Sequence, residues 1–554
     1  MFIETIYKGR FDSDLFRISS PPPDRNKVNR ILESYRSILK DYSPETLESA
    51  GRLPAELLGK MSAAGFFGLS IGSEYEGQGL SLREYLEVVE GMVKLDISIA
   101  ITFLAHLSIG VKAIQLFGTE EQKRRYLKPA ATGEMIFAYA LTEPRIGSDA
   151  QHIETTAVLN EEGTHYILNG RKAYITNANY AGGLTVFARL DPARPGFNGA
   201  FIVETGWEGV NVGQEMPKMG LKASSTAAIQ FRNVRIPVEN LIGKPGDGFK
   251  IAMSVLNYGR LGLGGASAAL MELSCRDMLK RASSRIQFGV PIKNFQLVRE
   301  KIVRAGVNAA VCSAMNRFIA GMLDNDPHFS AAIETSHCKL FGTTRAWDAA
   351  YDALQVAGGS GYLATHPFEK RMRDFRVATV FEGTTEIHSI YPALFGMRQI
   401  GKELSQSGKS FTGLLCQAVK QAVKPANWPV TFENRIMRSA TNEARRNARL
   451  VRLLLNAAVL LYGRTVMRGE IGDREFLFRR ITTLSLYMFG ILALLAKMRE
   501  DEAAGKLSRD DLHVLEYFVR EARAARRQNR HFFDSKKERL DAVVFRDLDD
   551  AVGE

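Results

Sequence analysis

The chain has 554 residues, too long for one compact core, so about two to four domains are expected. Hydrophobic residues make up 45% and charged residues 24%, a composition that excludes collagen-like and largely disordered chains. The net charge of +12 would suit acidic ligands or anionic lipid, and it would also serve solubility alone. Because no zinc-finger, homeodomain or RNA-binding signature accompanies the charge, we expect no nucleic-acid partner.

Cysteine usage and the first residues bear on the cellular compartment. The cysteines are Cys275, Cys312, Cys338 and Cys416. None belongs to a Cys-x-x-Cys pair, so we expect reduced thiols and no metal site. The first residues lack the basic start and apolar stretch of a secretory signal, and Glu4 and Asp12 argue against a transit peptide. We therefore expect a cytoplasmic protein of bacterial type, with peripheral contact at the inner membrane as an alternative.

The N-terminal part is expected to be an irregular lead-in followed by a helical domain, together spanning residues 1–135. Residues 1–24 show no clear period and end in a proline run, which predicts an extended conformation. Apolar residues then recur at helical spacing. The predicted helices cover 30–40, 53–63, 83–94 and 98–117, and another begins at Thr119 with the residues of a capping box.

A change of texture at residue 136 predicts a β-domain over 136–245. Short β-rich runs occur at 137–141, 164–168, 184–188, 200–203 and 226–231. Gly, Asn or Pro separates these runs, which is typical of antiparallel strands, so a barrel or sandwich is expected. A helical bundle domain is then predicted over 246–404, with a break near residues 324–328.

Residues 405–554 are expected to form a further helical extension, marked off by Ser405–Ser410 and by Pro425 and Pro429. It contains two apolar runs, 453–463 and 481–496. A membrane-spanning helix needs about 20 apolar residues, so both runs are better explained as buried bundle helices.

The run Phe381-Glu382-Gly383-Thr384-Thr385-Glu386-Ile387 is the most informative motif. It places a carboxylate between an aromatic residue and a glycine, at the foot of a predicted helix. Such a carboxylate can remove a weakly acidic carbon-bound proton if a dry site disfavours its charged form. A solvated Glu favoured by the helix dipole is the alternative for an isolated motif.

Four further segments support a catalytic role because they occur in a consistent order. They are the runs 139–149 (YALTEPRIGSD), 172–177 (KAYITN), 285–296 (RIQFGVPIKNFQ) and 355–362 (QVAGGSGY), the last followed by Arg371-Met-Arg373-Asp374. Over residues 30–400 the chain resembles the acyl-CoA dehydrogenase family, which binds FAD and desaturates acyl-CoA thioesters. The resemblance implies a mainly α fold with a central β-domain. It also implies an oxidoreductase.

The resemblance implies that Glu382 is the base that removes the α-proton, with the hydride passing to flavin N5. Some family members carry the base on an earlier helix, but here that position is Gly259. Arg260 matches a family arginine near the base, although a surface arginine is the alternative. The implied substrate-binding residues are Ser148, Asn257, Arg260 and Gly383. The glycines from 259 to 265 do not follow a strand, so we interpret them as helix-packing residues rather than a dinucleotide loop.

Further residues are expected at the cofactor by the same resemblance. Those near the flavin are Tyr139, Leu141, Thr142, Ser148, Tyr174, Thr176, Thr384 and Glu386. Those expected to hold the pyrophosphate and adenosine of a neighbouring subunit are Arg285, Gln287, Phe288, Gln296, Gln355, Gly358 and Gly359. An arginine pairs well with phosphate oxygens, and glycines admit close backbone approach. A homodimer is therefore implied.

Two features indicate a long-chain acyl-CoA substrate. The C-terminal extension, especially around residues 473–480, resembles that of very-long-chain acyl-CoA dehydrogenases, and so does the segment 104–110. Those relatives tend to have glycine where this chain has Ile101 and Leu104, and this bulk would shorten the acyl tunnel. The arginines Arg520, Arg523, Arg526, Arg527 and Arg530 fall on one helical face, which predicts either contact with anionic membrane or a solvated surface.

The leading interpretation is thus an FAD-dependent long-chain acyl-CoA dehydrogenase of fatty-acid β-oxidation that passes electrons to an electron-transfer flavoprotein. A dehydrogenase of shorter, branched or cyclic acyl-CoA, or a relative that reoxidises with oxygen, shares the same motifs. A non-catalytic assembly or scaffold protein of the same fold is the alternative from another class. Retention of Glu382, Thr142, Thr176 and Arg285 weighs against it.

Overall fold

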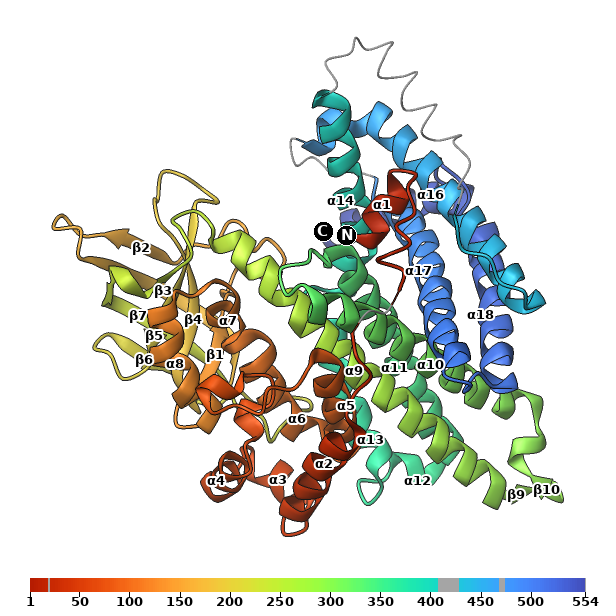
Figure 1. The fold of residues 1–554 in the computed structure, drawn as a ribbon, viewed down its shortest axis with the longest axis horizontal. Coiled ribbons are helices and arrows are strands. Elements are labelled where there is room, and N and C mark those ends of the chain that lie inside the picture. The colour runs from red at the N-terminus through yellow and green to blue at the C-terminus, as the bar shows by residue number, and fades with distance from the viewer. Residues whose placement is uncertain (18–19, 407–427, 468–473, 554) are drawn as a thin grey trace. The chain divides into compact units, whose positions relative to one another are not determined.

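The structure is a computed structural model that describes residues 1–17, 20–406, 428–467 and 474–553 (Figure 1). The chain forms two compact units. Unit 1 comprises Met1–Ile18, Ala331–Phe341 and Thr385–Glu554, and unit 2 comprises Ser19–Ser330 and Gly342–Thr384. The division into four sequential segments at 135, 245 and 404 stays a prediction. Cys416, Pro425 and parts of the runs 405–410 and 473–480 lie outside the described residues.

The N-terminal helices of unit 2 agree with the sequence pattern, apart from the helix over residues 44–50, which was not predicted. They are α2 (Arg25–Leu39), α3 (Pro44–Ala50), α4 (Ala55–Ala63), α5 (Leu82–Val93), α6 (Ile97–Leu104), α7 (Lys112–Phe117) and α8 (Glu120–Thr132). Capping boxes begin α5, from Ser81 to Glu84, and α8, from Thr119 to Gln122. The helix expected over 98–117 is interrupted by a π-helical turn, η3 (Ala105–Gly110). Such turns often mark functional positions.

The β-domain is a sheet of eight strands: β1 (Ile136–Ala140), β2 (Thr156–Leu159), β3 (His165–Thr176), β4 (Ala181–Arg189), β5 (Asn198–Glu204), β6 (Val210–Val212), β7 (Thr226–Pro237) and β8 (Leu241–Ile242). The strand order is β6-β7-β3-β2-β4-β5-β8, with β1 paired to β4. The expectation of a purely antiparallel sheet is wrong, because β1 runs parallel to β4. The reason is that the β1–β2 connection, residues 141–155, is a long loop rather than a hairpin turn.

The sheet presents its edge and one face to helices of the same unit. β1 packs against η3, and α9 (Gly248–Ser284) packs against β4 and β5 (Figure 1). The core of the β-domain contains Leu184, Val186, Phe201 and Ile229, which are fully buried. The end of β1 and the end of β3 therefore lie near the helices, and these ends carry the cofactor motifs.

The remaining helices of unit 2 begin with α9 and continue with α10 (Gln296–Asn325), part of α11 (Ala332–Ala357), α12 (Gly359–Tyr362) and α13 (Pro367–Phe375). The break expected near 324–328 is confirmed, since α10 ends at Asn325. Between α9 and α10, the strands β9 (Ile286–Gln287) and β10 (Val290–Pro291) form a hairpin that the sequence interpretation did not include. Its turn has φ +50° at Phe288 and +79° at Gly289, the backbone of a two-residue hairpin loop.

Unit 1 is a helical bundle of α14 (Thr385–Gln406), α16 (Arg435–Met467), α17 (Glu475–Ala503) and α18 (Arg509–Gln528), followed by α19 (Lys536–Gly553) (Figure 1). Within the residues that the structure describes, two helical segments are long and apolar enough to cross a membrane, Ile97–Phe117 and Glu475–Ala503. Their apolar windows are 89% and 83% buried in the protein, which favours the interpretation as core helices.

The first residues are not wholly irregular, which corrects the prediction for 1–24. Phe2–Tyr7 form helix α1, whose Phe2, Ile3 and Tyr7 side chains are buried in unit 1. The Tyr7 hydroxyl donates to Ser485 Oγ at 2.7 Å, and the Ile3 N–H donates to the Glu334 carboxylate at 2.7 Å. Tertiary burial therefore stabilises a helix too short to have a sequence signal of its own.

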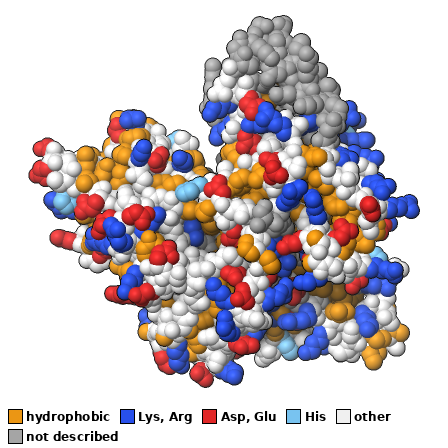
Figure 2. Space-filling model, viewed as in Figure 1, with side chains coloured by type: hydrophobic (Ala, Val, Ile, Leu, Met, Phe, Trp, Pro, Cys, Tyr) orange, Lys and Arg blue, Asp and Glu red, His pale blue; other side chains and the backbone are white. Residues whose placement is uncertain are grey.

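The expected arginine stripe is partly used inside unit 1. Arg526 Nε donates to Glu443 Oε1 at 2.6 Å, and Arg523 lies 3.6 Å from the same carboxylate, which is fully buried in α16. Arg520 pairs with Glu516 at 2.7 Å. Because these arginines hold α18 to α16 or pair along α18, fewer cations remain for a membrane surface. Figure 2 shows Lys and Arg side chains interspersed with Asp and Glu across the visible face.

Candidate active site

Glu382 lies in a short loop with an unusual backbone. Its φ is +55°, and the following Gly383 has φ +95°. A residue other than glycine rarely adopts positive φ, and the strain costs about 1–3 kcal/mol where it persists. Such strain is concentrated at functional sites. The backbone at Glu382 and Gly383 therefore sets the direction of the Glu382 carboxylate.

The carboxylate of Glu382 rests on Gly259 of α9. A methyl group built on Gly259 would come within 2.5 Å of Glu382 Oε2 and 2.6 Å of Oε1. No side chain therefore fits at position 259 while Glu382 keeps this position. The carboxylate of Glu382 therefore occupies the space that a side chain at position 259 would take.

Three polar side chains contact Glu382 or feel its charge. Arg260 Nε lies 3.5 Å from the backbone oxygen of Glu382, and Arg260 is 5% exposed. Burial and the charge of Glu382 raise the pKa of Tyr85 and of Tyr139 above the usual value. Tyr85 was not expected at the site. Its signal in the sequence, an isolated Tyr in an apolar helix, does not differ from that of a core residue.

The end of β1 and the end of β3 lie side by side. The Ala173 N–H donates to the Thr142 carbonyl at 2.9 Å. Lys172 Nζ donates to the Leu141 carbonyl at 3.0 Å. The structure thereby joins the two segments that the sequence assigned to the flavin.

A buried ion pair fixes this junction. Lys172 Nζ lies 2.7 Å from Glu143 Oε1, and the two side chains are 0% and 2% exposed. Glu143 also accepts the N–H groups of Glu154 at 2.6 Å and Thr155 at 2.9 Å, which closes the loop 143–155. Burial lowers the pKa of Lys172 to about 8. Burial would raise the pKa of Glu143, but the ammonium of Lys172 and the donors to this carboxylate bring it below its usual value.

Sequence reasoning missed the role of Lys172, and the reason is a bulge. In a regular strand, residues 172, 174 and 176 would share one face. The pairing of β3 with β7 shifts register between Lys172 and Ile175, and Tyr174 has φ +58°. Lys172 therefore points inward, whereas Tyr174 is 65% exposed. An exposed aromatic ring beside the junction suits a flavin, because a large apolar ring at the surface otherwise has little to contact.

The other expected residues near the junction differ in burial. Thr142 and Thr176 are partly buried, Ser148 is exposed in the loop that Glu143 closes, and Asn257 is 7% exposed on α9. Thr384 ends unit 2, whereas Glu386 lies in the first turn of α14 and so belongs to unit 1.

A second group of expected cofactor residues is exposed. Arg285, Gln287 and Phe288 belong to the β9–β10 hairpin and its base, and Phe288 is 94% exposed. Gln296 begins α10, and Gln355 lies in the last turn of α11, which ends at Ala357. Gly358 has φ +68°, and a methyl group on Gly358 or Gly359 would meet nothing within 4 Å. The site of a phosphate needs this kind of open backbone.

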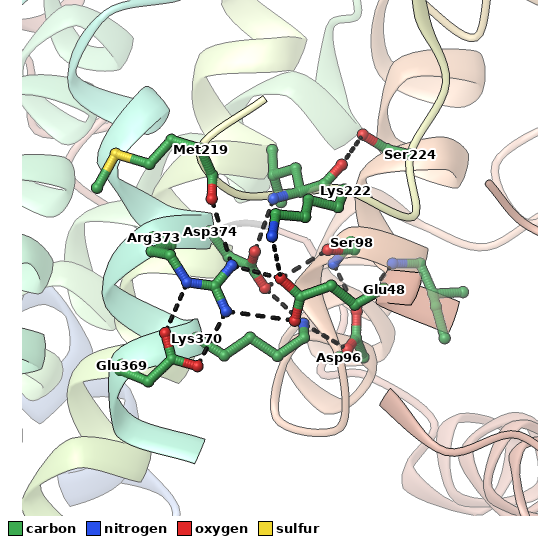
Figure 3. A network of polar contacts seen from close by, with 12 residues as sticks. Glu48, Asp96, Ser98, Met219, Lys222, Ser224, Glu369, Lys370, Arg373 and Asp374 are labelled. Carbon is green, nitrogen blue, oxygen red and sulfur yellow. Dashed lines mark hydrogen bonds and ion pairs between the residues drawn. The ribbon is translucent and has the colours of Figure 1, made fainter. Parts of the chain in front are cut away.

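A network of buried and partly buried charges supports the segment that leads to Glu382. Arg373 of α13 binds Glu369 through Nε at 2.6 Å and also pairs with Glu48 of α3 (Figure 3). Lys370 binds Asp96 at 2.9 Å and Asp374 at 2.6 Å. Asp374 accepts the N–H of Leu221 at 2.6 Å, where φ is +50°. Figure 3 shows these side chains converging from α3, α6, α13 and the loop before β7. They also line a cavity of about 510 Å³.

Three observations indicate that the residues of this site can hold FAD. Tyr174 offers an exposed ring beside hydroxyl-bearing Thr176, the loop glycines leave open backbone, and Arg285 lies in an exposed hairpin that carries Phe288. Together with a carboxylate held against Gly259, these features are those of a flavin-dependent enzyme.

Comparison with known proteins places the chain in a family. Models of the acyl-CoA dehydrogenase N-terminal, middle and C-terminal domains match residues 28–134, 138–234 and 246–391. The human very long-chain specific acyl-CoA dehydrogenase is 35% identical over 86% of this chain and 74% of that protein. The Macaca fascicularis protein of the same name is 39% identical over 69% of this chain, and the match spans only 58% of that relative.

Comparison with solved structures supports the same family. An acyl-CoA dehydrogenase complexed with FAD from Bacillus anthracis has a TM-score of 0.80 at 26% identity and covers 98% of this chain and 94% of that chain. A chain in a structure of the electron transferring flavoprotein of Acidaminococcus fermentans has a TM-score of 0.61 at 35% identity over 66% of this chain and 96% of that chain. The chain belongs to the acyl-CoA dehydrogenase family of FAD-dependent oxidoreductases.

Proposed function

We propose that the protein dehydrogenates a long-chain acyl-CoA to the trans-2-enoyl-CoA in fatty-acid β-oxidation, with Glu382 as the base. The observation that carries the proposal is the strained Glu382 backbone, which sets the carboxylate against Gly259. A fixed carboxylate needs no rearrangement before it takes the α-proton of a bound thioester. Bound FAD supplies the acceptor for the hydride that leaves the β-carbon.

The other residues prepare the substrate for this proton transfer. The α-proton is weakly acidic, so the thioester oxygen must accept hydrogen bonds as negative charge develops on it. The Glu382 N–H is the donor of this chain proposed for that oxygen. Arg260 and Asn257 lie on the same helix as Gly259 and would orient the thioester, and Ser148 in its exposed loop would contact the CoA moiety.

The proposed function also implies an electron acceptor and a second copy of the chain as partners. The relatives of high similarity act on very long-chain substrates by name, and the structural likeness to a chain from an electron transferring flavoprotein study supports such a protein as electron acceptor. We also propose a homodimer in which Arg285, Gln287 and Phe288 of one copy complete the cofactor site of the other, and a cytoplasmic location.

A shorter acyl chain is the second candidate, because a specific contact favours it. A methyl group built on Gly262 would lie 2.8 Å from Leu104 Cδ2. Gly262 follows Gly259 by about one helical turn and shares its face of α9. Leu104 therefore fills space about one turn beyond the base, where a longer acyl tunnel would need room.

The test is anaerobic addition of palmitoyl-CoA to the purified holoprotein while the visible flavin band is recorded. We expect the band to bleach in the unsubstituted protein. In Glu382→Gln it should persist, with turnover reduced by at least about 10³-fold and FAD retained. Glu300→Gln, an exposed acid on α10, is the control and should bleach normally.

Two results would contradict the proposal. Bleaching by shorter thioesters but not by palmitoyl-CoA would favour the second candidate. Unchanged turnover in Glu382→Gln would remove Glu382 from the mechanism.

A further inference from the structure

Tyr85 of α5 and Ser108 of η3 form a buried pair of hydroxyl groups in unit 2, the unit that also contains Glu382. The Tyr85 hydroxyl and Ser108 Oγ are 3.0 Å apart, and each residue is only 3% exposed. No step of the proposed reaction uses this pair. Because burying a polar group is unfavourable unless it is hydrogen-bonded, the presence of two hydroxyls here needs a separate explanation.

The pair has one hydrogen-bond donor more than it uses. Each hydroxyl carries one proton, and the single bond between them engages only one of the two. Within the residues that the structure describes, neither hydroxyl has another protein partner. Ser267 of α9 shows the usual alternative, because its hydroxyl donates to the Leu263 carbonyl one turn earlier at 2.7 Å. A buried donor without an acceptor is costly, so the pair is suited to an acceptor from outside the chain.

The pair borders the gap that Gly262 leaves on α9. A methyl group built on Gly262 would lie 3.4 Å from Ser108 Oγ and 2.8 Å from Leu104 Cδ2. Gly259, against which the Glu382 carboxylate rests, comes three residues earlier in the same helix. Side chains three residues apart on a helix start about 5–6 Å from each other. The hydroxyl pair therefore lies about one helical turn beyond the proposed base, next to Leu104.

This separation determines which part of a bound acyl chain would face the pair. The proposed base takes its proton from carbon 2 of the acyl group, and an extended chain of single bonds advances about 1.2 Å per bond. A span of about 5–6 Å then corresponds to about four or five bonds. An oxygen attached to carbon 5 or carbon 6 is four or five bonds from carbon 2, so it would come within reach of the spare proton.

The local charge favours a neutral oxygen over a carboxylate. Burial raises the pKa of Tyr85, and the negative charge of Glu382 acts in the same direction. This charge would repel a carboxylate that stood beside the hydroxyl pair. A hydroxyl or ketone oxygen accepts a hydrogen bond without carrying a charge, so it would not be repelled in this way.

We propose that Tyr85 and Ser108 form a subsite for a hydroxyl or ketone oxygen on carbon 5 or 6 of the acyl chain, and that they select acyl-CoA substrates oxygenated at this position. The proposal rests on the proposed function, because it takes the acyl chain to extend from Glu382 towards Leu104. A site built to hydrogen-bond a substrate oxygen discriminates against an analogue without it, because the buried donor is then left unpaired.

Thioesters of equal size test the subsite on the FAD-loaded protein. The thioesters 6-hydroxyhexanoyl-CoA and heptanoyl-CoA differ only by a hydroxyl in place of the terminal methyl group. Their Kd values are measured by calorimetry in Glu382→Gln, so that binding is read without turnover. We expect the hydroxylated thioester to bind at least about fivefold more tightly. The pair 8-hydroxyoctanoyl-CoA and nonanoyl-CoA places the same difference two carbons further along, and it should show no such preference.

Removal of both hydroxyls tests the residues. Either hydroxyl alone keeps one donor, so Tyr85→Phe and Ser108→Ala should each retain part of the preference. The double variant has no donor, so it should bind heptanoyl-CoA at least as tightly as 6-hydroxyhexanoyl-CoA, and its binding of heptanoyl-CoA shows that it is folded. Tyr35→Phe removes another buried tyrosine hydroxyl of unit 2. It is the matched control and should keep the full preference.

Three results would overturn the proposal. They are equal binding of the two six-carbon-position probes, an equal preference for the hydroxyl in 8-hydroxyoctanoyl-CoA, and a preference that survives in the double variant. The first two need no change in the hydroxyl pair, so they test the proposal even if the double variant loses FAD. Bleaching by palmitoyl-CoA is read in the protein with intact Glu382, so failure of the subsite and failure of the proposed reaction are distinguishable.

Discussion

Glu382 and Gly259 specify each other. The strained φ of Glu382 brings its carboxylate to the place where any side chain at 259 would stand, and the missing side chain of Gly259 leaves room for it. A sequence motif can name the acid, but the match between a positive φ in one segment and an absent Cβ in another is visible only in three dimensions. The two features together indicate a base position that other residues hold in place.

The buried pair of Lys172 and Glu143 is expected to hold the flavin junction. Replacing Lys172 by Met leaves Glu143 as an unpaired buried charge, which costs about 3–5 kcal/mol. It also removes the hydrogen bond to Leu141 beside Thr142. We expect Lys172→Met to lower the melting temperature and the affinity for FAD, measured by calorimetry and by flavin fluorescence titration.

A double variant separates stability from positioning. Lys172→Met with Glu143→Gln removes both charges, so the protein should regain most of its melting temperature. The bond to Leu141 and part of the loop closure remain lost, so FAD should still bind at least about tenfold more weakly. Normal FAD affinity in this double variant would reduce the pair to a stabilising role.

His106 makes unit 2 sensitive to acid. Its Nδ1 accepts the Phe137 N–H at 2.9 Å, so Nε2 carries the proton and faces the Ala130 carbonyl at 3.1 Å. Burial lowers the pKa of His106 to about 4, below the value near 6.5 of an unfolded chain. The unfolded state therefore binds a proton first. Stability is complete above about pH 6.5 and falls by roughly 3 kcal/mol as the pH drops to about 4.

The measurement is the free energy of unfolding by urea at several pH values. In His106→Gln the loss between pH 6.5 and 4 should be smaller by most of that amount for the transition of unit 2. His337 of unit 1, whose pKa burial lowers to about 3, is the matched comparison. If His106→Gln keeps the full acid sensitivity, other groups cause it.

At the scale of elements, the contact of Leu104 in α6 with Gly262 in α9 is proposed to limit the depth of the acyl site. Leu104→Ala removes three carbon atoms over Gly262 and should open room for a longer chain. Each buried methylene contributes about 0.8 kcal/mol, so the ratio of kcat/KM for longer over shorter thioesters should rise about 10- to 100-fold. Leu107→Ala, in the adjacent π-helical turn, is the control for lost packing. An unchanged ratio in Leu104→Ala, with FAD still bound, would place the end of the tunnel elsewhere.

Periodic elements were predictable from the sequence, and irregular ones were not. Most N-terminal helices of unit 2 and five strands agree with apolar spacing and turn residues because each buries one face and begins or ends at a local signal. The antiparallel arrangement of β1 was wrong, since pairing partners depend on the loop between strands. Helix α1, the π-helical turn η3 and the bulge at Tyr174 carry no local signal, because packing from distant segments stabilises them.

The candidate site likewise contains residues that the sequence predicted and residues that it did not. Motifs named Glu382, Thr142, Tyr174 and Thr176, and the structure joins the segments around Thr142 and Tyr174. Tyr85 and Lys172 were missed, because an aromatic residue in a helix and a lysine in a strand are ordinary in sequence. Their roles come from what lies beside them after folding. The structure adds the supporting residues, whereas the motifs supply the residues that are proposed to react.

For the whole molecule, the exposed residues of the second cofactor group argue that one copy does not complete its own site. Arg285 and Gln287 are exposed on a hairpin that ends in the 94% exposed Phe288. A monomer would gain nothing from presenting these side chains to water. In a homodimer, each copy would instead supply its hairpin to the cofactor whose flavin end is held beside Glu382 of the other copy.

Complementation between two inactive variants tests this arrangement. Glu382→Gln lacks the base, and Arg285→Ala lacks a phosphate contact, so each alone should be inactive or weakly loaded. When the two are unfolded, mixed in equal amounts and refolded with FAD, about half of the dimers contain one of each. In such a dimer, one site combines the intact Glu382 of one copy with the intact Arg285 of the other. Activity should therefore reach about a quarter of that of the unsubstituted protein. If both residues served the same copy's site, no mixed dimer would contain an intact site and the mixture would stay inactive.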